Sequence, residues 1–348
     1  MLLTIALLTK NSEDTVRFAL RSIYRQKIPD NVTFELIVVD GYSKDNTLKI
    51  VAKEIQKLKE KFQNQFVRHI ILQERVGIGY ARNLALKEAQ GDWIFWVDSD
   101  NVLAQDYILK AVKEIGKISH ENIAVLYPQR VISDPRKRNF ASKLIVCYGK
   151  VLAYQSNSKL FTIAKRLLSK QLKDPIQKML PYTAMQGTFC NVEALRKVGG
   201  FNPYLIAAED IDVFLKLISN GYKMSSFNST LYYFARDSLR AWFRQAMIWE
   251  YGKIVMYLFN TYDNKCSTLR MIRTQYTLNT SKITEFFITL IINSVAILMT
   301  KVRACTPLEA LFSPLLYFYR RVGYSVGRLY GLQQERFLRK LLRRGVDN

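Results

Sequence analysis

Compact apolar runs alternate with amphipathic segments along the N-terminal part of the chain. In the first amphipathic segment, Val16, Leu20 and Ile23 recur at the spacing that places side chains on one helix face. The apolar runs predict strands over Leu2–Leu8, Phe34–Val39, Val67–Leu72 and Trp93–Val97. The amphipathic segments predict helices over Asp14–Gln26, Thr47–Phe62 and Ile78–Ala89. This alternation is typical of an α/β fold whose mostly parallel sheet is covered on both faces.

Polar residues stand at the ends of three predicted strands. Thr9, Asp40 and Asp98 each come at or just after the end of an apolar run. In parallel sheets, ligands bind beyond the carboxyl ends of the strands. The sequence therefore predicts a binding site at this edge of the sheet.

The rest of the chain follows a different pattern. Residues 136–180 predict basic, partly amphipathic helices between the apolar run Val125–Val131 and the segment Gln186–Cys190. A further helix is predicted over 209–218, and the chain is helical and aromatic after Asp237. We expect a domain over residues 1–235 with an insertion at about 131–181, followed by a helical C-terminal region over 236–348.

The formal net charge is +23, and two segments hold most of it. Residues 131–181 contain 11 basic and 2 acidic side chains, and residues 236–348 contain 18 and 7. Such a surplus favours an anionic partner, either a membrane surface or a phosphate group. Charge alone also suggests nucleic acid, but no nucleic-acid-binding motif accompanies it, so we expect no nucleic-acid partner.

The C-terminal apolar runs leave their relation to a membrane open. Phe286–Thr300 is uncharged but shorter than the roughly 18–20 residues of a spanning helix. Ala304–Tyr319 contains Glu309 and two prolines. The pattern over 283–333 is compatible with a hairpin in the bilayer, with helices in its interface, or with a buried core helix. No basic segment precedes Leu2–Leu8, so we expect no signal peptide.

The number and spacing of the cysteines and histidines argue against a fold that is stabilised by a structural metal ion or by disulfide bonds. The four cysteines are scattered without a CxxC motif, and the chain has only two histidines. We therefore expect neither a structural zinc site nor a disulfide framework.

Two acidic pairs are candidates for chemistry. Asp98 and Asp100 are separated by one residue at a strand exit, where their oxygens suit a hard cation such as Mg²⁺ or Mn²⁺. Glu209 and Asp210 open a predicted helix. There they either stabilise the helix N-terminus or provide a general base.

Four segments in sequence order resemble family 2 glycosyltransferases with the GT-A fold. They are TIALLTKNSEDTVRFALRSIYRQ, ELIVVDGYSKDNT, GIGYARNLALKEAQGDWIFWVDSDN and GTFCNVEALRKVGGFNPYLIAAEDIDVFLKL. The resemblance covers roughly residues 1–255. It implies transfer of a sugar from a nucleotide-diphosphate donor to an acceptor, with inversion at the anomeric carbon.

The resemblance also implies roles for single residues. Asp40 matches the aspartate that recognises the nucleotide base, Thr9 lies in the loop that lines the base, and Arg82 matches a residue near the nucleotide pocket. The metal-binding and catalytic positions are matched by a further set: Asp98 and Asp100 as ligands of Mn²⁺ or Mg²⁺, and Asp210 as catalytic base with Glu209 beside it.

The chain departs from the family at several positions. The family often has two acidic residues where this chain has Asp40-Gly41, and glycine where it has Tyr42. The segment SLRAWFRQAMIWEYGK resembles membrane-associated members that make surface polysaccharides or lipid-linked glycans. Ile248 replaces the arginine of the QxxRW motif of processive synthases, so we do not expect processive polymerisation.

Arg240 and Arg244 lie one helical turn apart in that segment. They are candidates to bind an anionic acceptor or the donor's diphosphate, or they are simply solvated. The sequence thus predicts a metal-assisted, inverting hexosyltransferase at the cytoplasmic face of the cell membrane. Its acceptor is expected to be a polyprenyl phosphate or a lipid-linked glycan. The alternative is a soluble glycosyltransferase that acts on a small molecule or a protein.

Overall fold

A computed structural model describes residues 1–74, 77–118, 121–134 and 180–262, together with residues 141, 143, 145–146, 315–316, 319–320 and 322–331. The chain divides into two compact units. The first unit comprises Met1–Ile132 and Pro181–Phe234, and the second comprises Ser133–Leu180 and Ala235–Asn348. The helices predicted within 136–180 and the apolar runs Phe286–Thr300 and Ala304–Tyr319 lie largely outside the described residues.

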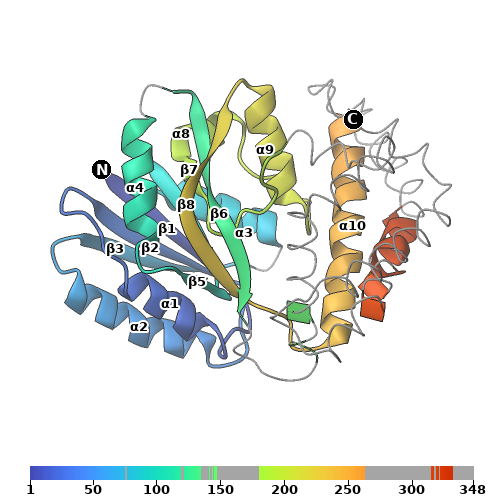
Figure 1. Ribbon diagram of the computed structural model, residues 1–348, viewed down its shortest axis with the longest axis horizontal. Coiled ribbons are helices and arrows are strands. Elements are labelled where there is room, and N and C mark those ends of the chain that lie inside the picture. Colours follow the sequence, from blue (N-terminus) through green and yellow to red (C-terminus); the bar gives the residue numbers. More distant parts are fainter. Residues whose placement is uncertain are drawn as a thin grey trace, which may run out of the picture. The chain divides into compact units, whose positions relative to one another are not determined.

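The first unit is built on an eight-stranded sheet with the order β3-β2-β1-β4-β7-β6-β8-β5 (Figure 1). Its strands are β1 (Leu2–Thr9), β2 (Thr33–Asp40), β3 (Phe66–Gln73), β4 (Trp93–Asp98), β5 (Asn101–Leu103), β6 (Ile123–Asp134), β7 (Phe189–Asn191) and β8 (Lys223–Phe234). The strands β3, β2, β1 and β4 are parallel, which confirms the prediction for this part of the sheet. The pairs β4–β7, β7–β6 and β8–β5 are antiparallel, so the whole sheet is mixed.

The helices are α1 (Val16–Tyr24), α2 (Thr47–Lys61), α3 (Ile78–Glu88), α4 (Tyr107–Lys117), α8 (Val192–Lys197), α9 (Glu209–Ser219) and, in the second unit, α10 (Leu239–Tyr262). The three predicted N-terminal helices are confirmed. The predicted face of α1 is buried in the core.

Strand alternation separates the two faces of the sheet. Leu3, Ile5 and Leu7 of β1 point into a core shared with α1, α2 and α4, whose side chains fill one face. The opposite face includes Trp96, which packs edge-on against Phe201. Helix α3 contacts β1 and β2. The sheet is therefore covered on both faces by helices (Figure 1).

The strand register brings the predicted polar residues to one edge. Thr9 pairs with Asp40 across β1 and β2, and Asp98 pairs with Leu8 across β4 and β1. Three residues that are far apart in the sequence are thus neighbours at the carboxyl ends of parallel strands. This is the edge at which such sheets bind ligands.

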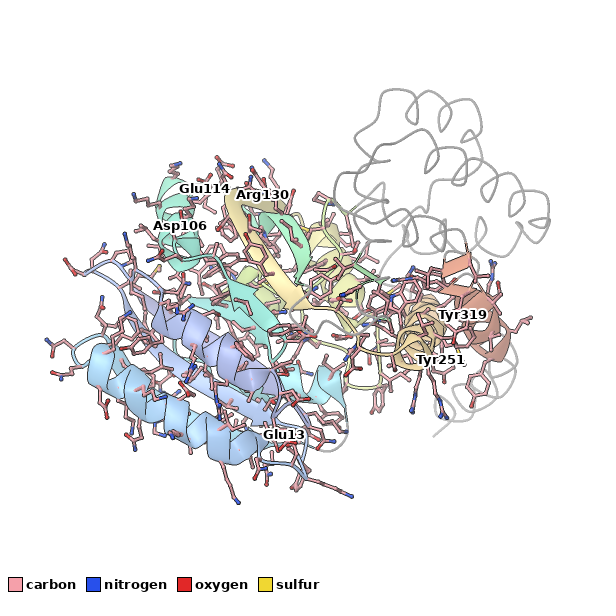
Figure 2. All side chains as sticks on the ribbon, turned by 60° about the horizontal axis from the view of Figure 1, so that its bottom comes forward. Glu13, Asp106, Glu114, Arg130, Tyr251 and Tyr319 are labelled. Atoms are coloured by element: carbon pink, nitrogen blue, oxygen red, sulfur yellow. The ribbon has the colours of Figure 1, made fainter. Side chains whose placement is uncertain are left out.

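In the described part of the second unit, a helical segment over residues 322–331 packs against α10. Gly323 and Gly327 lie against Phe243 and Met247 of α10, so close that a Cβ atom at Gly327 would collide with the Met247 backbone. This unit also contains aromatic side chains, among them Tyr251 and Tyr319, which are labelled in Figure 2. None of the helices in the described part of the chain is long and apolar enough to span a membrane.

Candidate active site

The loops that follow β1 and β2 are tied together around Asp40. The Asp40 carboxylate is fully buried and accepts hydrogen bonds from the amide and the hydroxyl of Ser43, at 2.8 and 2.6 Å. The Gly41 amide donates to the Thr9 carbonyl at 2.7 Å, and the Asn11 amide donates to Ser43 Oγ at 2.8 Å. These bonds fix the edge of the sheet before any ligand binds.

A second set of bonds joins the same loops further out. Glu13, labelled in Figure 2, accepts hydrogen bonds from the amide and the side chain of Asn46, both at 3.0 Å. The Asp45 carboxylate accepts from the Glu13 amide and from Thr47. Burial raises the pKa of Asp45. The hydrogen bonds from Thr47 and Glu13 outweigh this effect, so the pKa is lowered overall. The loops therefore behave as one hydrogen-bonded surface.

Backbone strain is concentrated at this edge. Among the described residues other than glycine, Asn11, Tyr42 and Ala208 have positive φ, at 46°, 57° and 66°. Asn11 follows β1, Tyr42 follows β2, and Ala208 precedes Glu209 at the start of α9. A left-handed conformation costs residues with a Cβ atom roughly 1–2 kcal/mol, and such costs cluster at functional sites. The strained positions therefore mark the predicted site independently of its acidic residues.

Asn101 organises the turn that carries the two predicted metal ligands. Its side-chain oxygen accepts a hydrogen bond from the Asp98 amide at 3.0 Å. Its side-chain nitrogen donates to Asp100 Oδ1 at 3.1 Å and to Gln186 Oε1 at 3.0 Å. Because Asn101 is completely buried, it holds the Asp98 backbone and the Asp100 carboxylate in a fixed relation to Gln186.

Arg82 lies at the centre of the acidic residues. Its side chain is 3% exposed, and its Nε donates to Glu209 Oε1 at 3.2 Å. Its Nη2 lies 3.7 Å from Asp98 Oδ1, and its guanidinium lies 5.3 Å from the centre of the Trp96 ring. Its Nη1 is buried without a hydrogen-bond acceptor among the described residues. The cation thus pairs with two carboxylates and keeps the N–H groups of Nη1 for a further anion.

The two acidic residues at the start of α9 hold their protons more tightly than usual. Burial raises the pKa of Glu209 although the neighbouring Arg82 charge opposes the shift. Burial and the Glu209 charge raise the pKa of Asp210 to about 7, while Arg82 and the Ile211 and Met185 amides act against the shift. A carboxyl group with this pKa can accept a proton at neutral pH and release it again.

The Asp98 and Asp100 side chains suit a divalent cation that is shared with a ligand. Asp98 Oδ1 is buried and accepts no hydrogen bond from the described residues, although Arg82 lies within ion-pair distance. In the described part of the chain, no three acidic, histidine or cysteine side chains gather as a metal site. Mg²⁺ and Mn²⁺ sites commonly use one or two carboxylates and take the other oxygens from phosphate and water. The residues present therefore fit such a cation only together with a phosphate ligand.

The structure adds residues that the sequence analysis did not select. Tyr182 donates to the Gln186 carbonyl at 3.1 Å, and its ring stacks on Tyr127 at 5.1 Å. Burial and the charges of Asp210 and Asp98 raise the pKa of Tyr182. Asn101 could have been selected from the sequence, because it directly follows the acidic pair Asp98 and Asp100. No sequence pattern could have selected Tyr182, because it comes immediately after the basic insertion and outside any segment with helix or strand periodicity.

The predicted site residues fall into two groups. Those of the first unit meet at one edge of the sheet: Thr9, Asp40, Arg82, Asp98, Asp100, Glu209 and Asp210. Arg240 and Arg244 lie on α10 in the second unit, where both are exposed. Their role remains a prediction.

Comparison with known proteins identifies the family of this chain. Residues 4–183 match the family model described as glycosyl transferase family 2. The poly(ribitol-phosphate) beta-N-acetylglucosaminyltransferase TarS of Staphylococcus aureus is 33% identical over 118 residues, which are 34% of this chain and 19% of that protein. The poly-beta-1,6-N-acetyl-D-glucosamine synthase of Staphylococcus aureus is 27% identical over 227 residues, which are 64% of this chain and 47% of that protein.

A solved structure supports the fold. The mannosyltransferase PcManGT from Pyrobaculum calidifontis, in complex with GDP-Man and Mn²⁺, matches with a TM-score of 0.58 and 17% identity. The match covers 96% of this chain and 86% of that one. The α/β fold is therefore GT-A-like. The chain matches only a fifth to a half of the length of the two curated relatives named above.

Replacing Arg82 by methionine tests its place in the acidic cluster. We expect Arg82→Met to lower the free energy of unfolding by about 3–5 kcal/mol, because Glu209 is left buried without its cation. Chemical denaturation measures this loss. The matched control is Lys197→Met, which removes an exposed ion pair with Glu193 and should change stability little. Equal effects of the two substitutions would show that Arg82 is not holding buried charge.

Proposed function

Because the chain belongs to glycosyl transferase family 2, we propose that it transfers a sugar from a nucleotide-diphosphate donor to an acceptor in the synthesis of a surface glycan. The observation that carries the proposal is the cluster around Arg82. One buried cation lies between Asp98 and Glu209, and the adjacent Asp210 has a pKa of about 7. A buried cation with a free Nη1 beside a carboxyl group of this pKa suits phosphate binding next to a general base.

The donor lies, in this proposal, across the carboxyl ends of β1, β2 and β4. Asp40 and Thr9 line the position of the nucleotide base. The unpaired Nη1 of Arg82 is available for the diphosphate. The mannosyltransferase with the similar fold binds GDP-Man and Mn²⁺, which supports a donor of this class without fixing its base or sugar.

Asp98 and Asp100 would hold the Mn²⁺ or Mg²⁺ ion. Such an ion, when bound, neutralises the negative charge that develops on the departing diphosphate. Asn101 keeps the turn that carries them in position through its bonds to the Asp98 amide and the Asp100 side chain.

Asp210 would act as the general base. Its carboxylate takes the proton of the acceptor hydroxyl while the acceptor oxygen forms a bond to the anomeric carbon. The bond from that carbon to the diphosphate oxygen breaks on the opposite side, which inverts the configuration. If the acceptor is itself a phosphate, no proton needs removal, and Asp210 would orient the acceptor instead.

The charge of the second unit supports an anionic acceptor or surface. This unit contains 29 basic and 9 acidic residues, whereas the first unit contains 23 and 20. The first relative named above acts, by its name, on poly(ribitol phosphate), a polyanion. We propose that this chain works at the cytoplasmic face of the cell membrane on a lipid-linked acceptor, either a polyprenyl phosphate or a lipid-linked glycan.

Sedimentation with lipid vesicles tests the membrane proposal. We expect the full-length protein to pellet with phosphatidylglycerol vesicles at low salt and to be released as salt screens the charges. Vesicles of neutral phosphatidylcholine are the control. A protein that stays in the supernatant with both lipids would favour the alternative of a soluble enzyme with a small-molecule or protein acceptor.

Nucleotide binding tests the donor site. We expect isothermal titration to show Mn²⁺-dependent binding of one of UDP, GDP and CDP. Asp100→Ala should weaken that binding at least about tenfold, because a cation ligand is lost. The matched control is Asp106→Ala, which removes an exposed carboxylate that pairs with Lys110 on α4. Unchanged Mn²⁺-dependent binding in Asp100→Ala would exclude Asp100 as a ligand.

The pKa of Asp210 predicts opposite effects on stability and activity. The raised pKa stabilises the folded protein below the pKa of the unfolded carboxyl, and this contribution is lost as pH rises through about 7. Asp210→Asn should therefore melt at a higher temperature than wild type at pH 8 and show a flatter pH dependence. Sugar transfer to a hydroxyl acceptor should fall by roughly 10²–10⁴-fold. Wild-type turnover in this variant would remove Asp210 from the mechanism.

A further inference from the structure

The Arg82 guanidinium is held by aromatic rings as well as by carboxylates. Its Cζ atom lies over the Trp96 ring, 5.3 Å from the ring centre, and over the Phe201 ring at 5.8 Å. A cation within roughly 6 Å of a ring centre is attracted to the face of the ring. The two rings meet edge to face, with an angle of 82° between their planes. Trp96 and Phe201 therefore form a corner around the cation, which we call the aromatic corner.

The aromatic corner is fixed by the backbone on both sides. In β4, the Trp96 amide donates to the Thr188 carbonyl at 2.9 Å. Phe201 is clamped from α3, because the Asn83 side chain accepts from the Phe201 amide at 2.8 Å and donates to its carbonyl at 2.7 Å. Asn83 directly follows Arg82 in α3, so one turn of this helix supplies the cation and holds one of its two rings. The corner is thus a built part of the fold.

Packing alone does not require a tryptophan at position 96. The residue is completely buried, and its indole N–H makes no hydrogen bond in the described part of the chain, although it lies near the weakly accepting thiol of Cys190. A buried N–H group without an acceptor destabilises a fold. Phenylalanine would supply an aromatic ring here without that cost. What tryptophan adds is the ring face that attracts a cation most strongly.

The orientation of the guanidinium decides which of its nitrogens stays free. Nε of Arg82 donates to Glu209 and Nη2 lies near Asp98, which leaves Nη1 buried without an acceptor among the described residues. Carboxylates attract every N–H group of a guanidinium, so they alone do not keep Nη1 free. Rings that pack against the guanidinium restrict its rotation. The aromatic corner therefore supplies the restraint that the acidic residues do not.

We propose that Trp96 is a positioning residue of the sugar transfer: its ring keeps the Arg82 guanidinium in the orientation that leaves Nη1 free for the donor's diphosphate. This inference rests on the proposed function, because it needs a diphosphate at Arg82. Trp96 acts through Arg82 and makes no contact of its own with the donor. Loss of a cation–π contact of this kind corresponds to a change of about 2- to 30-fold in the affinity for the diphosphate.

Two substitutions grade the ring, and the same strand offers their matched controls. Trp96→Phe keeps a weaker ring, and Trp96→Leu removes it. Trp93→Phe and Trp93→Leu make the same changes in β4, but Trp93 lies in the core on the opposite face of the sheet. Each variant is titrated with inorganic pyrophosphate in the presence of Mn²⁺. We expect Trp96→Leu to bind about 2- to 30-fold more weakly than wild type, Trp96→Phe to fall between the two, and both Trp93 variants to stay within about twofold of wild type.

Fluorinated tryptophan tests the proposal without changing the shape of the core. Fluorine withdraws electron density from the ring face and so weakens its attraction for a cation. The chain contains four tryptophans, so the fluorinated residue is incorporated at all of them, in wild type and in Trp96→Phe. We expect the pyrophosphate affinity of the wild-type chain to fall stepwise as each ring carries more fluorine atoms, and that of Trp96→Phe to stay constant. A tryptophan that only fills space would give no such series.

Two results would overturn the proposal while leaving the donor site in place. One is equal weakening of pyrophosphate binding by the Trp96 and Trp93 substitutions, because the ring would then serve only the fold. The other is an affinity of the wild-type chain that does not change with the number of fluorine atoms. Failure of the proposed function has a different signature: wild type would bind neither pyrophosphate nor any of UDP, GDP and CDP, and Trp96 would have no diphosphate site to act on.

Discussion

The ion pair between Arg82 and Glu209 is the interaction on which the arrangement of the site depends. Arg82 comes from α3, beside the parallel strands, and Glu209 opens α9, which follows β7 in the sequence. Asp98 and Asp210 lie close enough for their charges to act on the same group of residues. Without a buried cation, three neighbouring carboxylates would repel one another in a poorly solvated environment. The charge of Arg82 lets them remain together, and it limits how far the pKa of Asp210 rises.

The second constraint is conformational and acts through the loops. Asn11 and Tyr42 adopt left-handed backbones in two loops that are bound to each other and to Asp40. The fold holds these loops in place because Asp40 is buried at the end of β2, between β1 and β3. A site held in this way needs little rearrangement to receive a ligand, which lowers the entropic cost of binding. Charge and strain thus act at the same edge but by independent means.

The sequence predicted the parallel half of the sheet well and the antiparallel half poorly. Strands β1 to β4 have six to eight residues each and are mostly apolar, so they are easy to detect. Strands β5 and β7 have three residues each, which is too short to show an alternation of apolar and polar residues. Thr9, Asp40 and Asp98 were accessible because strand ends predict an edge. The contact between Arg82 and Glu209, 127 residues apart, followed from no local pattern, and only the family resemblance selected both residues.

The place of β7 in the sheet has a consequence for how the chain folds during synthesis. Residues 189–191 pair with β4 on one side and with β6 on the other, although the basic insertion separates them from both. Until the ribosome has made them, β4 is an open edge with the sequence WIFWVD, and open apolar edges invite pairing with other chains. At about 5–20 residues per second, this edge stays unprotected for several seconds. Glu209 and Asp210 follow β7 closely in the sequence, so the nascent chain acquires these two carboxylates only after the residues that cover the open edge of β4 have been made.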